Sequence, residues 1–365
     1  MNSIARRRFV SQHLIAPALR SAVEVVRALG AVQAQDYPNA KWAIGQRTTG
    51  LIDADIEQTF ARGEILRTHV LRPTWHFVLP EDARWLLELT GPRVKAAMAS
   101  YDRKLGLDAP TFRKSHAILE RALRDGQQLT RTELRETLRR AGLKVPSGHH
   151  AGNLLLRAEL DRVVISGARR GKQFTYALFD ERVPPARTPG GDRDEALGKL
   201  ASRYFATRSP ATVHDFSWWS GLAMGDARRA IEIAGRSLAR EQHDGRDYWA
   251  VRDRASGKRA RIAHLLPNYD EYFIGFKDRS AFAERLGGVA TKAQLDALWG
   301  HVLFVDGQMV GGWRRTPDAS DVVLRLLLTL TPPERNLVLR AGRRFAKFLG
   351  SPVRVDFGRA RSSRR

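Results

Sequence analysis

The sequence predicts an α+β protein. Three successive segments show apolar residues at helical spacing, followed by two short stretches with the alternation of strands. The chain from residue 259 onward is mostly strand-like and ends in one helical pattern. With 365 residues, 43% of them hydrophobic and 28% charged, the chain can build several domains with buried cores and is not a disordered tail.

Residues 1–79 are the first segment. Helices are expected at 4–14, 22–32 and 53–61, and strands at 65–70 and 74–79. Asp53 is expected to cap the third helix. Leu71, Arg72 and Pro73 are expected to form the turn between the strands.

Residues 80–184 repeat this plan. Helices are expected at 80–105, 111–124, 130–141 and 151–162, and strands at 163–166 and 174–178. Thr130 and Glu133 have the spacing of a capping box. The two strands flank a basic tip at 169–172, and a linker rich in Pro and Gly follows at 184–191.

Residues 192–258 are the third segment. Helices are expected at 193–206, 212–220 and 225–234, with extended stretches at 248–251 and 259–265. Helices followed by a two-stranded wing are the plan of the winged helix, a relative of the helix-turn-helix. Three such units in tandem on a basic chain predict three winged-helix domains.

Residues 259–365 are predicted to form a small β-rich domain with a terminal helix. Its strongest signal is a hairpin at 301–305 and 308–313, because the intervening Asp306-Gly307 suits a type I′ turn. Further strands are expected at 272–276 and 322–330, and the final helix at 332–349.

The charge balance points to a polyanionic partner. The chain has 62 Lys and Arg residues against 39 Asp and Glu residues, a formal charge of +23. A GC-rich genome would replace Lys by Arg, but it does not explain the excess of cations over carboxylates. Nucleic acid is therefore expected ahead of an anionic membrane.

Several classes of site are excluded or disfavoured. The chain has no cysteine, which excludes disulfides, iron–sulfur clusters and thiol nucleophiles. It has no phosphate-binding Gly-rich loop, no zinc-protease motif and no nucleophile elbow. The histidines lack ligand spacing, so we expect no metal and no cofactor. The N-terminus is not a convincing signal peptide and the longest apolar run is too short to cross a bilayer, so a cytoplasmic location is expected.

Residues 31–38 are unusual because they place two glutamines, Gln33 and Gln35, and the carboxylate of Asp36 after an apolar helix. In an extended backbone residues i and i+2 share a face, so Gln33 and Gln35 can address one pocket only where the helix has unwound. The alternative is two glutamines at a solvent-facing helix end.

Four motifs together resemble one family. They are Gln33-Ala34-Gln35, the run at 67–76, the run at 266–272 and Val305-Asp306-Gly307. In this order, across most of the chain, they resemble the AlkZ/YcaQ family of bacterial winged-helix DNA glycosylases. The resemblance implies three winged-helix units followed by a C-terminal β-barrel. The Gln-x-Gln motif is similar to the AlkZ-like branch, whereas YcaQ-like members have Gln-x-Asp.

The resemblance further implies that Gln33 and Gln35 position the hydrolytic water in the excision of N7-alkylated purines, with bulky adducts or interstrand crosslinks as possible substrates. An N7-alkylated guanine is already cationic, so its base leaves without strong protonation. A neutral amide offers one acceptor and one donor group, which can orient water but is too weakly basic to be a strong general base. A monofunctional glycosylase is therefore expected.

Five further residues could support catalysis, and each has a structural alternative. Asp36 could instead cap the turn before Pro38, and Arg72 could reach phosphate, support its turn or form a buried ion pair. His69 and His76 lie on opposite sides of that turn, and each could instead be a surface or core histidine. Asp270, with Tyr269, could line a cleft or pack in the barrel.

Two basic stretches are expected to bind DNA, because wings and hairpins project along phosphates. They contain Arg169, Arg170 and Lys172 in the first, and Arg252, Arg254, Lys258, Arg259 and Arg261 in the second. The alternative for each is a solvated charge run.

The expected partner is double-stranded DNA with alkylated bases, bound by a monomer for repair or for self-resistance to a genotoxin. One alternative is a non-catalytic winged-helix DNA-binding protein or transcription regulator, which would usually be dimeric. A second alternative, an RNA-binding protein, has the charge but lacks a recognisable RNA module.

Overall fold

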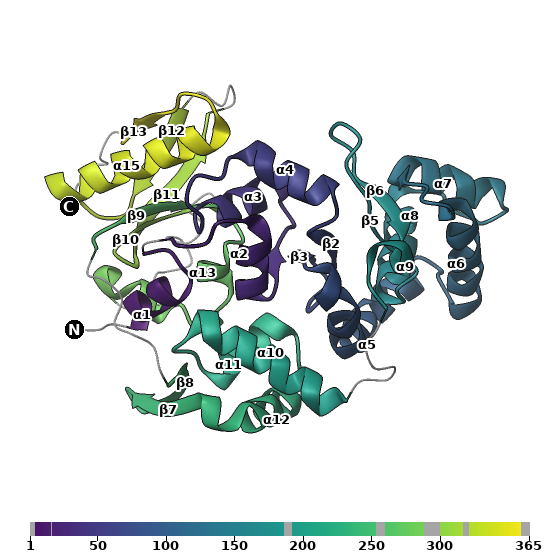
Figure 1. Cartoon of the computed structure of the whole chain (residues 1–365), viewed down its shortest axis with the longest axis horizontal. Coiled ribbons are helices and arrows are strands. Elements are labelled where there is room, and N and C mark those ends of the chain that lie inside the picture. Colours follow the sequence, from purple (N-terminus) through teal and green to yellow (C-terminus); the bar gives the residue numbers. More distant parts are fainter. Residues whose placement is uncertain are drawn as a thin grey trace.

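The structure is a computed structural model that describes residues 4–15, 17–185, 192–252, 260–287, 300–316 and 321–358. Within these residues helices and four separate sheets confirm the α+β class (Figure 1). No helix among them is long and apolar enough to cross a membrane.

The first segment surrounds a three-stranded sheet of order β1-β3-β2. Its elements are α1 (Ile4–Ser11), α2 (Ala22–Leu29), β1 (Val32–Gln33), α3 (Tyr37–Gly45), α4 (Asp53–Ala61), β2 (Leu66–His69) and β3 (Trp75–Val78). Helix α3 was not predicted, although Asp36 at its N-cap and Pro38 in its first turn are ordinary signals for a helix start. Asp53 is the first residue of α4 rather than its cap, since Ile52 takes the cap position.

The second segment is a lobe on the right of Figure 1. Its elements are α5 (Pro80–Lys104), α6 (Ala109–Leu123), β4 (Leu129–Thr130), α7 (Arg131–Arg140), α8 (Gly148–Leu160), β5 (Val164–Ser166), β6 (Thr175–Leu178) and α9 (Phe179–Arg182). The predicted capping box is present, because Thr130 accepts from the N–H of Glu133, whose carboxylate accepts from the N–H of Thr130. From α6 to β6 the lobe has a hydrophobic core of its own.

The third segment ends in a two-stranded sheet that differs from the prediction. Its elements are α10 (Arg193–Arg208), α11 (Val213–Ser220), α12 (Met224–Ala234), the 3-10 turn η1 (Gly235–Ser237), β7 (Leu238–His243) and β8 (Arg246–Val251). Strand β8 pairs with β7, not with the stretch at 259–265. The missed signal is Asp244-Gly245, whose positive φ angles of 48° and 70° suit a tight hairpin.

The C-terminal segment builds a five-stranded sheet of order β13-β12-β11-β10-β9. Its elements are β9 (Ala263–Leu266), α13 (Glu271–Ile274), η2 (Ser280–Phe282), η3 (Glu284–Leu286), β10 (Val302–Val305), β11 (Gln308–Arg315), β12 (Asp321–Leu326), α15 (Pro332–Leu349) and β13 (Arg354–Asp356). The Asp306-Gly307 hairpin is confirmed. The strand predicted at 272–276 is instead the short helix α13, which Asp270 caps.

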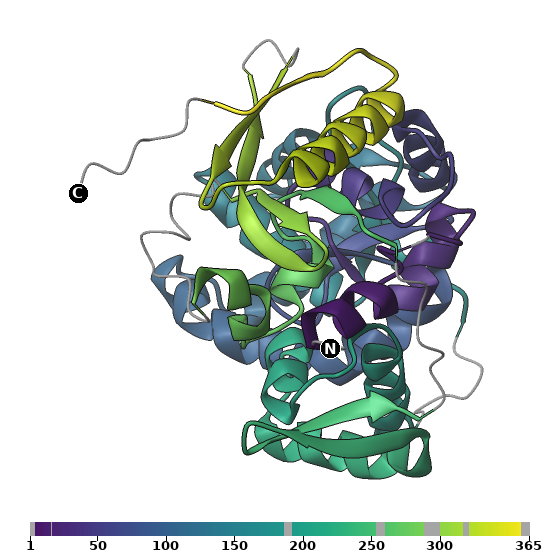
Figure 2. The same ribbon diagram turned by 90° about the vertical axis from the view of Figure 1, so that its left-hand side faces the viewer.

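This sheet curls against α15 and remains open within the described residues, because its edge strands β9 and β13 do not pair with each other (Figure 2). It is thus a half-barrel rather than a closed barrel. Trp42 of α3 packs on Phe345 and Phe348 of α15, with ring centroids 4.9 and 5.0 Å apart. The first segment and this sheet therefore share one core.

Helix α1 packs away from the rest of the first segment. It lies between the C-terminal sheet and the helices of the third segment (Figure 2). Its Phe9 contacts Tyr272, with ring centroids 4.8 Å apart. Segments far apart in sequence are thus fixed around β1, which carries Gln33 and lies two residues before Gln35.

Candidate active site

Gln33 lies on β1 and is buried, with 6% of its surface exposed. The helix α2 ends at Gly30, which has a left-handed φ of 78°, and the chain then becomes extended and pairs with β3, Gln33 opposite His76. The side-chain carbonyl of Gln33 accepts a hydrogen bond from Arg72 Nη2 at 3.1 Å. Because arginine only donates, this contact fixes the Gln33 amide with its oxygen toward Arg72.

Gln35 is exposed and lies two residues further along the same extended stretch. The ladder to β3 continues at Ala34, whose N–H donates to Trp75 O at 2.7 Å. Gln35 Oε1 accepts from the N–H of Trp75 at 3.4 Å. Alternation along this extended stretch puts the side chains of Gln33 and Gln35 on the same side.

Beneath Gln33 lies a buried ion pair that the sequence did not reveal. The carboxylate of Glu271 accepts from Gln33 N at 2.9 Å and binds Arg208 Nη2 at 2.7 Å. Trp219 Nε1 also donates to it at 2.9 Å. Burial opposes ionisation of Glu271, but the neighbouring groups, led by Arg208, together outweigh it, and the pKa of this carboxyl is lowered. The backbone of Gln33 is therefore anchored to an ionised carboxylate.

Arg72 lies on the tight turn between β2 and β3. Leu71 in this turn has a left-handed φ of 66°, and Gly221 packs so closely that an added Cβ would lie 2.0 Å from Leu71 O. The Arg72 guanidinium lies 5.7 Å from the ring centroid of Trp218. Burial lowers the pKa of Arg72. The turn thus places a cation next to Gln33.

The two histidines have different surroundings. His69 is buried and its Nδ1 lies 2.6 Å from Glu159 Oε2. Its ring contacts that of Trp75, with centroids 4.3 Å apart and planes tilted by 42°. His76 is fully buried, with Nδ1 2.9 Å from Thr74 O. Burial, aided by Arg72, lowers the pKa of His76 to about 3, so this residue is neutral at pH 7.

Two predicted supporting carboxylates have structural partners. Asp36 caps α3, with its two oxygens accepting from the N–H and the Nδ2 of Asn39 at 3.3 and 2.7 Å. Asp270 is fully buried and forms two hydrogen bonds of 2.9 Å with Arg47. Asp36 thus has the capping contact of its structural alternative, whereas the ion pair of Asp270 with Arg47 was not among the alternatives for that residue.

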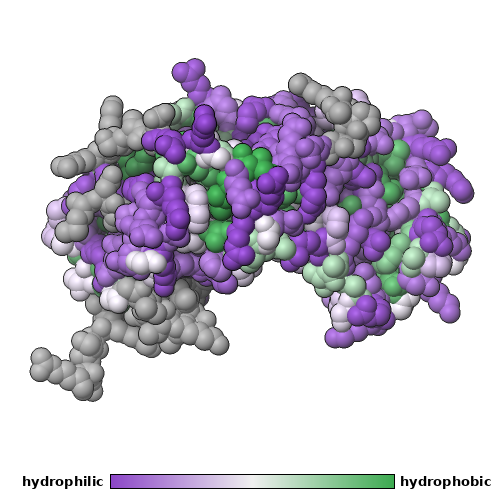
Figure 3. All heavy atoms as spheres, turned by 90° about the horizontal axis from the view of Figure 1, so that it is seen from below, coloured by the Kyte–Doolittle hydropathy of each residue, from purple (hydrophilic) through white to green (hydrophobic). Residues whose placement is uncertain are grey.

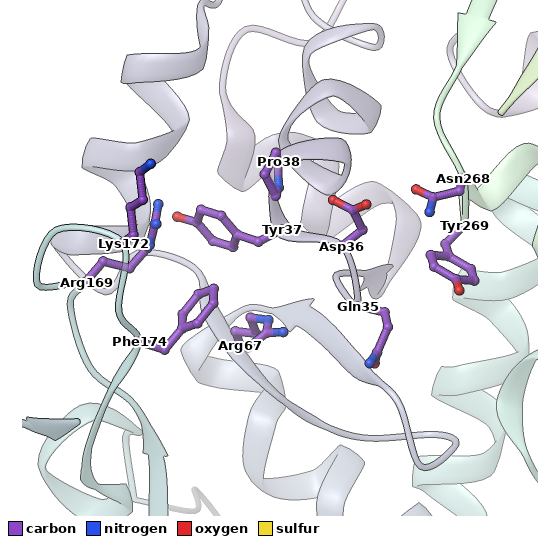
Figure 4. A pocket seen from close by; sticks show the side chains of 10 residues that line it. All are labelled: Gln35, Asp36, Tyr37, Pro38, Arg67, Arg169, Lys172, Phe174, Asn268 and Tyr269. Carbon is purple, nitrogen blue, oxygen red and sulfur yellow. The ribbon is translucent and has the colours of Figure 1, made fainter. Parts of the chain in front are cut away.

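A cleft of about 530 Å³ opens beside Gln35 (Figure 4). Arg67 and Gln35 lie on its floor, and Asn268 and Tyr269 lie on the side opposite Phe174. Its lining residues are Gln35, Asp36, Tyr37, Pro38, Arg67, Arg169, Lys172, Phe174, Asn268 and Tyr269. Arg67, Phe174 and Tyr37 were not predicted as site residues, because their approach depends on the lobe at 80–184 folding against β2.

The basic tip at 169–172 contributes to this cleft unevenly. Arg169 pairs with Glu57 Oε2 at 3.1 Å and Arg170 with Glu133 Oε1 at 2.6 Å. Lys172 is exposed and lines the cleft. The face seen from below is largely hydrophilic, with a hydrophobic area near its middle, and is indented between this lobe and the rest of the molecule (Figure 3).

The second basic stretch is only partly described. Arg252 is exposed, and Arg261 forms an ion pair with Asp306 at 2.8 Å. Arg254, Lys258 and Arg259 lie outside the described residues. Among the residues that the structure describes, no cluster of His, Asp or Glu could hold a metal ion.

Comparison with known proteins identifies the family. A model of the AlkZ-like DNA glycosylase family matches residues 26–348. The chain belongs to the AlkZ-like DNA glycosylase family. It is 26% identical over 315 residues to an interstrand DNA cross-link repair glycosylase from Streptomyces sahachiroi, covering 80% of this chain and 82% of that protein.

Its fold is similar to that of Streptomyces sahachiroi DNA glycosylase AlkZ, with a TM-score of 0.78, 22% identity and coverage of 96% and 98% of the two chains. As an AlkZ-like DNA glycosylase the chain is an enzyme that acts on DNA. This decides against the alternatives of a non-catalytic regulator and an RNA-binding protein.

Proposed function

We propose that this glycosylase excises N7-alkylated purines by hydrolysis, with the attacking water held by Gln33 and Gln35. The observation that carries the proposal is the extended, β3-paired backbone at Gln33 and Ala34, which by alternation turns both amides to one side, with Gln35 in a cleft lined by cations. A cationic purine is a good leaving group, so the site needs orientation of water more than a strong acid or base.

Each amide has a distinct part in this proposal. Gln33 is held by Arg72 at its carbonyl and by Glu271 at its backbone N–H, which leaves its NH₂ group to donate to water or to the sugar. Gln35 is exposed, and within the described residues its side chain has only a long contact to the N–H of Trp75, so its carbonyl can turn to accept a hydrogen bond from the water. Undamaged guanine, a poorer leaving group, would be spared.

The substrate range is proposed to include bulky adducts and interstrand crosslinks. The support is the Streptomyces sahachiroi relative, whose name is interstrand DNA cross-link repair glycosylase, together with a cleft that is open beside Gln35. The biological role would be base excision repair of alkylation damage or antibiotic self-resistance. The enzyme would be monofunctional, because the proposed nucleophile is water.

We also propose that residues 1–79, 80–184 and 192–258 are winged-helix units ahead of a barrel-like domain at 259–365. In each of the three, two antiparallel strands follow the main helices, as the pairs β2 with β3, β5 with β6 and β7 with β8, which supports this division. A monomer in the cytoplasm, bound to the nucleoid, is the proposed working state.

The test is Gln35→Ala in single-turnover excision of N7-methylguanine from duplex DNA, in buffer with EDTA. Excision should fall roughly 10²–10⁴-fold, the range for a positioned catalytic group, while duplex binding changes little. Gln33→Ala should resemble Gln35→Ala rather than add to it, because both act on one water. Gln35→Asp should retain appreciable activity with a new dependence on a carboxylate pKa.

The matched control is Gln58→Ala, at an exposed position of α4, which should excise at the wild-type rate. Wild-type rates for both site variants, with folding intact, would remove the two glutamines from the mechanism. An absence of free N7-methylguanine with the wild-type protein would instead overturn this substrate class.

A further inference from the structure

Arg67 on β2 is buried in an unusual way. Only 7% of its surface is exposed, and its Nε donates to Ala34 O at 3.0 Å. The guanidinium lies between two rings, 4.2 Å from the centroid of Trp75 and 4.3 Å from that of Phe174. Within the described residues no carboxylate forms an ion pair with it. The group is thus contacted by two aromatic rings rather than by an anion.

The other buried arginines of the described chain are paired. Arg8, Arg47 and Arg208 bind Asp215, Asp270 and Glu271, respectively. Buried cations normally need such a partner, because burial without one is costly. Glu159 is the carboxylate with the largest electrostatic effect on Arg67, but it already accepts hydrogen bonds from His69. Burial lowers the pKa of Arg67 to about 10, which still leaves it charged at pH 7.

The unpaired guanidinium lies in the cleft beside Gln35 (Figure 4). Lys172, on the same side of the cleft as Phe174, adds a second cation that is exposed. The carboxylate of Asp36 also lines the cleft, but both its oxygens accept from Asn39. The cleft therefore offers fixed positive charge to an anion that comes from outside.

We propose that Arg67, assisted by Lys172, binds the backbone phosphate that flanks the excised nucleotide. This inference rests on the proposed function. A planar guanidinium suits two oxygens of a phosphodiester, and the flanking rings keep it oriented before DNA arrives. Because Arg67 Nε also holds the carbonyl of Ala34, between the two glutamines, the bound phosphate fixes the scissile bond relative to Gln33 and Gln35.

The experiment combines protein variants with DNA in which single phosphates are replaced by neutral methylphosphonates. With the wild-type protein, one position next to the N7-methylguanine should lower single-turnover excision roughly 10- to 100-fold, as expected for a charge-assisted hydrogen bond. Arg67→Met should lower excision to a similar extent. The same methylphosphonate should then cause little further loss in Arg67→Met, since both changes remove one interaction.

Lys172→Ala is the second variant, because an exposed side chain can be removed without loss of folding. It should show partial coupling to the same or the adjacent phosphate. Arg67→Lys keeps the charge but loses the planar fork, so it should recover part of the rate. Methylphosphonates elsewhere in the duplex should act independently of all three variants.

The two hypotheses fail in different ways. If the wild-type protein releases no N7-methylguanine from any duplex, the proposed function fails. Suppose instead that the base is released while the fold-loss in rate from each methylphosphonate is the same in the wild type, in Arg67→Lys and in Lys172→Ala. These cations then do not bind a particular phosphate, and the inference is overturned. Thermal melts of each variant identify any loss that comes from unfolding.

Discussion

At the scale of the residue, His76 links the candidate site to acid stability. Its folded-state pKa of about 3 lies below the ordinary 6.5, so the unfolded chain binds its proton first as pH falls. The associated stability is complete above pH 6.5 and decreases toward pH 3, by about 1.4 kcal/mol per pH unit. Between pH 6.5 and pH 5, urea denaturation should show a loss of about 2 kcal/mol from this residue.

Carboxylates also make the free energy of unfolding depend on pH, so the test compares this dependence between the wild type and variants. His76→Asn should have a smaller decrease in its free energy of unfolding over this range. His149→Asn, at an exposed position of α8, should match the wild-type decrease. Equal decreases for all three would mean that His76 does not remain neutral in the fold.

Candidate site residues could be named from the sequence where they form a local motif. Gln33 and Gln35 were singled out because the Gln-x-Gln motif resembles the AlkZ-like branch, whereas their spacing alone also fitted a solvent-facing helix end. The partner of Gln33, Glu271, is 238 residues away, and the partner of Asp270, Arg47, is 223 residues away. No local pattern encodes such pairs, so Arg47, Arg208 and Glu271 emerged only from the structure.

At the scale of the element, the turn between β2 and β3 depends on the C-cap of α11. Gly221 has φ +71° and would place a Cβ against Leu71 O. Gly221→Ala should therefore shift the turn that carries Arg72 and destabilise the protein by about 1–3 kcal/mol. Excision, measured at a temperature where the variant is folded, should fall about 10-fold or more, because small displacements at a site are costly.

Gly225→Ala is the matched control, because it lies in α12 with open space around the added Cβ. It should be neutral or stabilising by up to about 1 kcal/mol, with unchanged excision. If Gly221→Ala excises at the wild-type rate despite its lower stability, the position of this turn does not limit the reaction.

Elements were predicted well where periodicity and caps agree. The helices α4 and α15 have the predicted bounds, and the Asp306-Gly307 hairpin lies where its turn chemistry places it. Helix α3 and strand β7 were missed although each has a local signal, Asp36 with Pro38 for one and Asp244-Gly245 for the other. The extended stretch before 265 was assigned to the wrong sheet, because strand pairing is set by tertiary packing rather than by alternation.

At the scale of the whole molecule, tertiary packing joins the segments that the sequence separates. The first segment shares a core with the C-terminal sheet, and α1 packs with the third segment. Only the stretch from α6 to β6 has a separate core among the described residues. The lobe that carries Lys172 and Phe174 contacts β2 through β5 and α8, and residues of both line the cleft.

The net charge of +23 predicts DNA binding that weakens steeply with salt, but the structure divides the basic tip into two kinds of cation. Arg170 is held by Glu133 Oε1 and Gln128 O, at 2.6 and 2.8 Å, whereas Lys172 is exposed in the cleft.

A cation that neutralises one phosphate releases condensed counterions and contributes about 0.9 to the slope of log K against log salt. Lys172→Ala should therefore reduce the slope by nearly that amount, and Arg170→Ala by less than half of it. Fluorescence anisotropy measures the affinity for one duplex at KCl concentrations from about 50 to about 300 mM, which resolves the difference in slope. If both variants reduce the slope by the same amount, the ion pair of Arg170 with Glu133 opens when DNA binds, because each cation would then neutralise a phosphate.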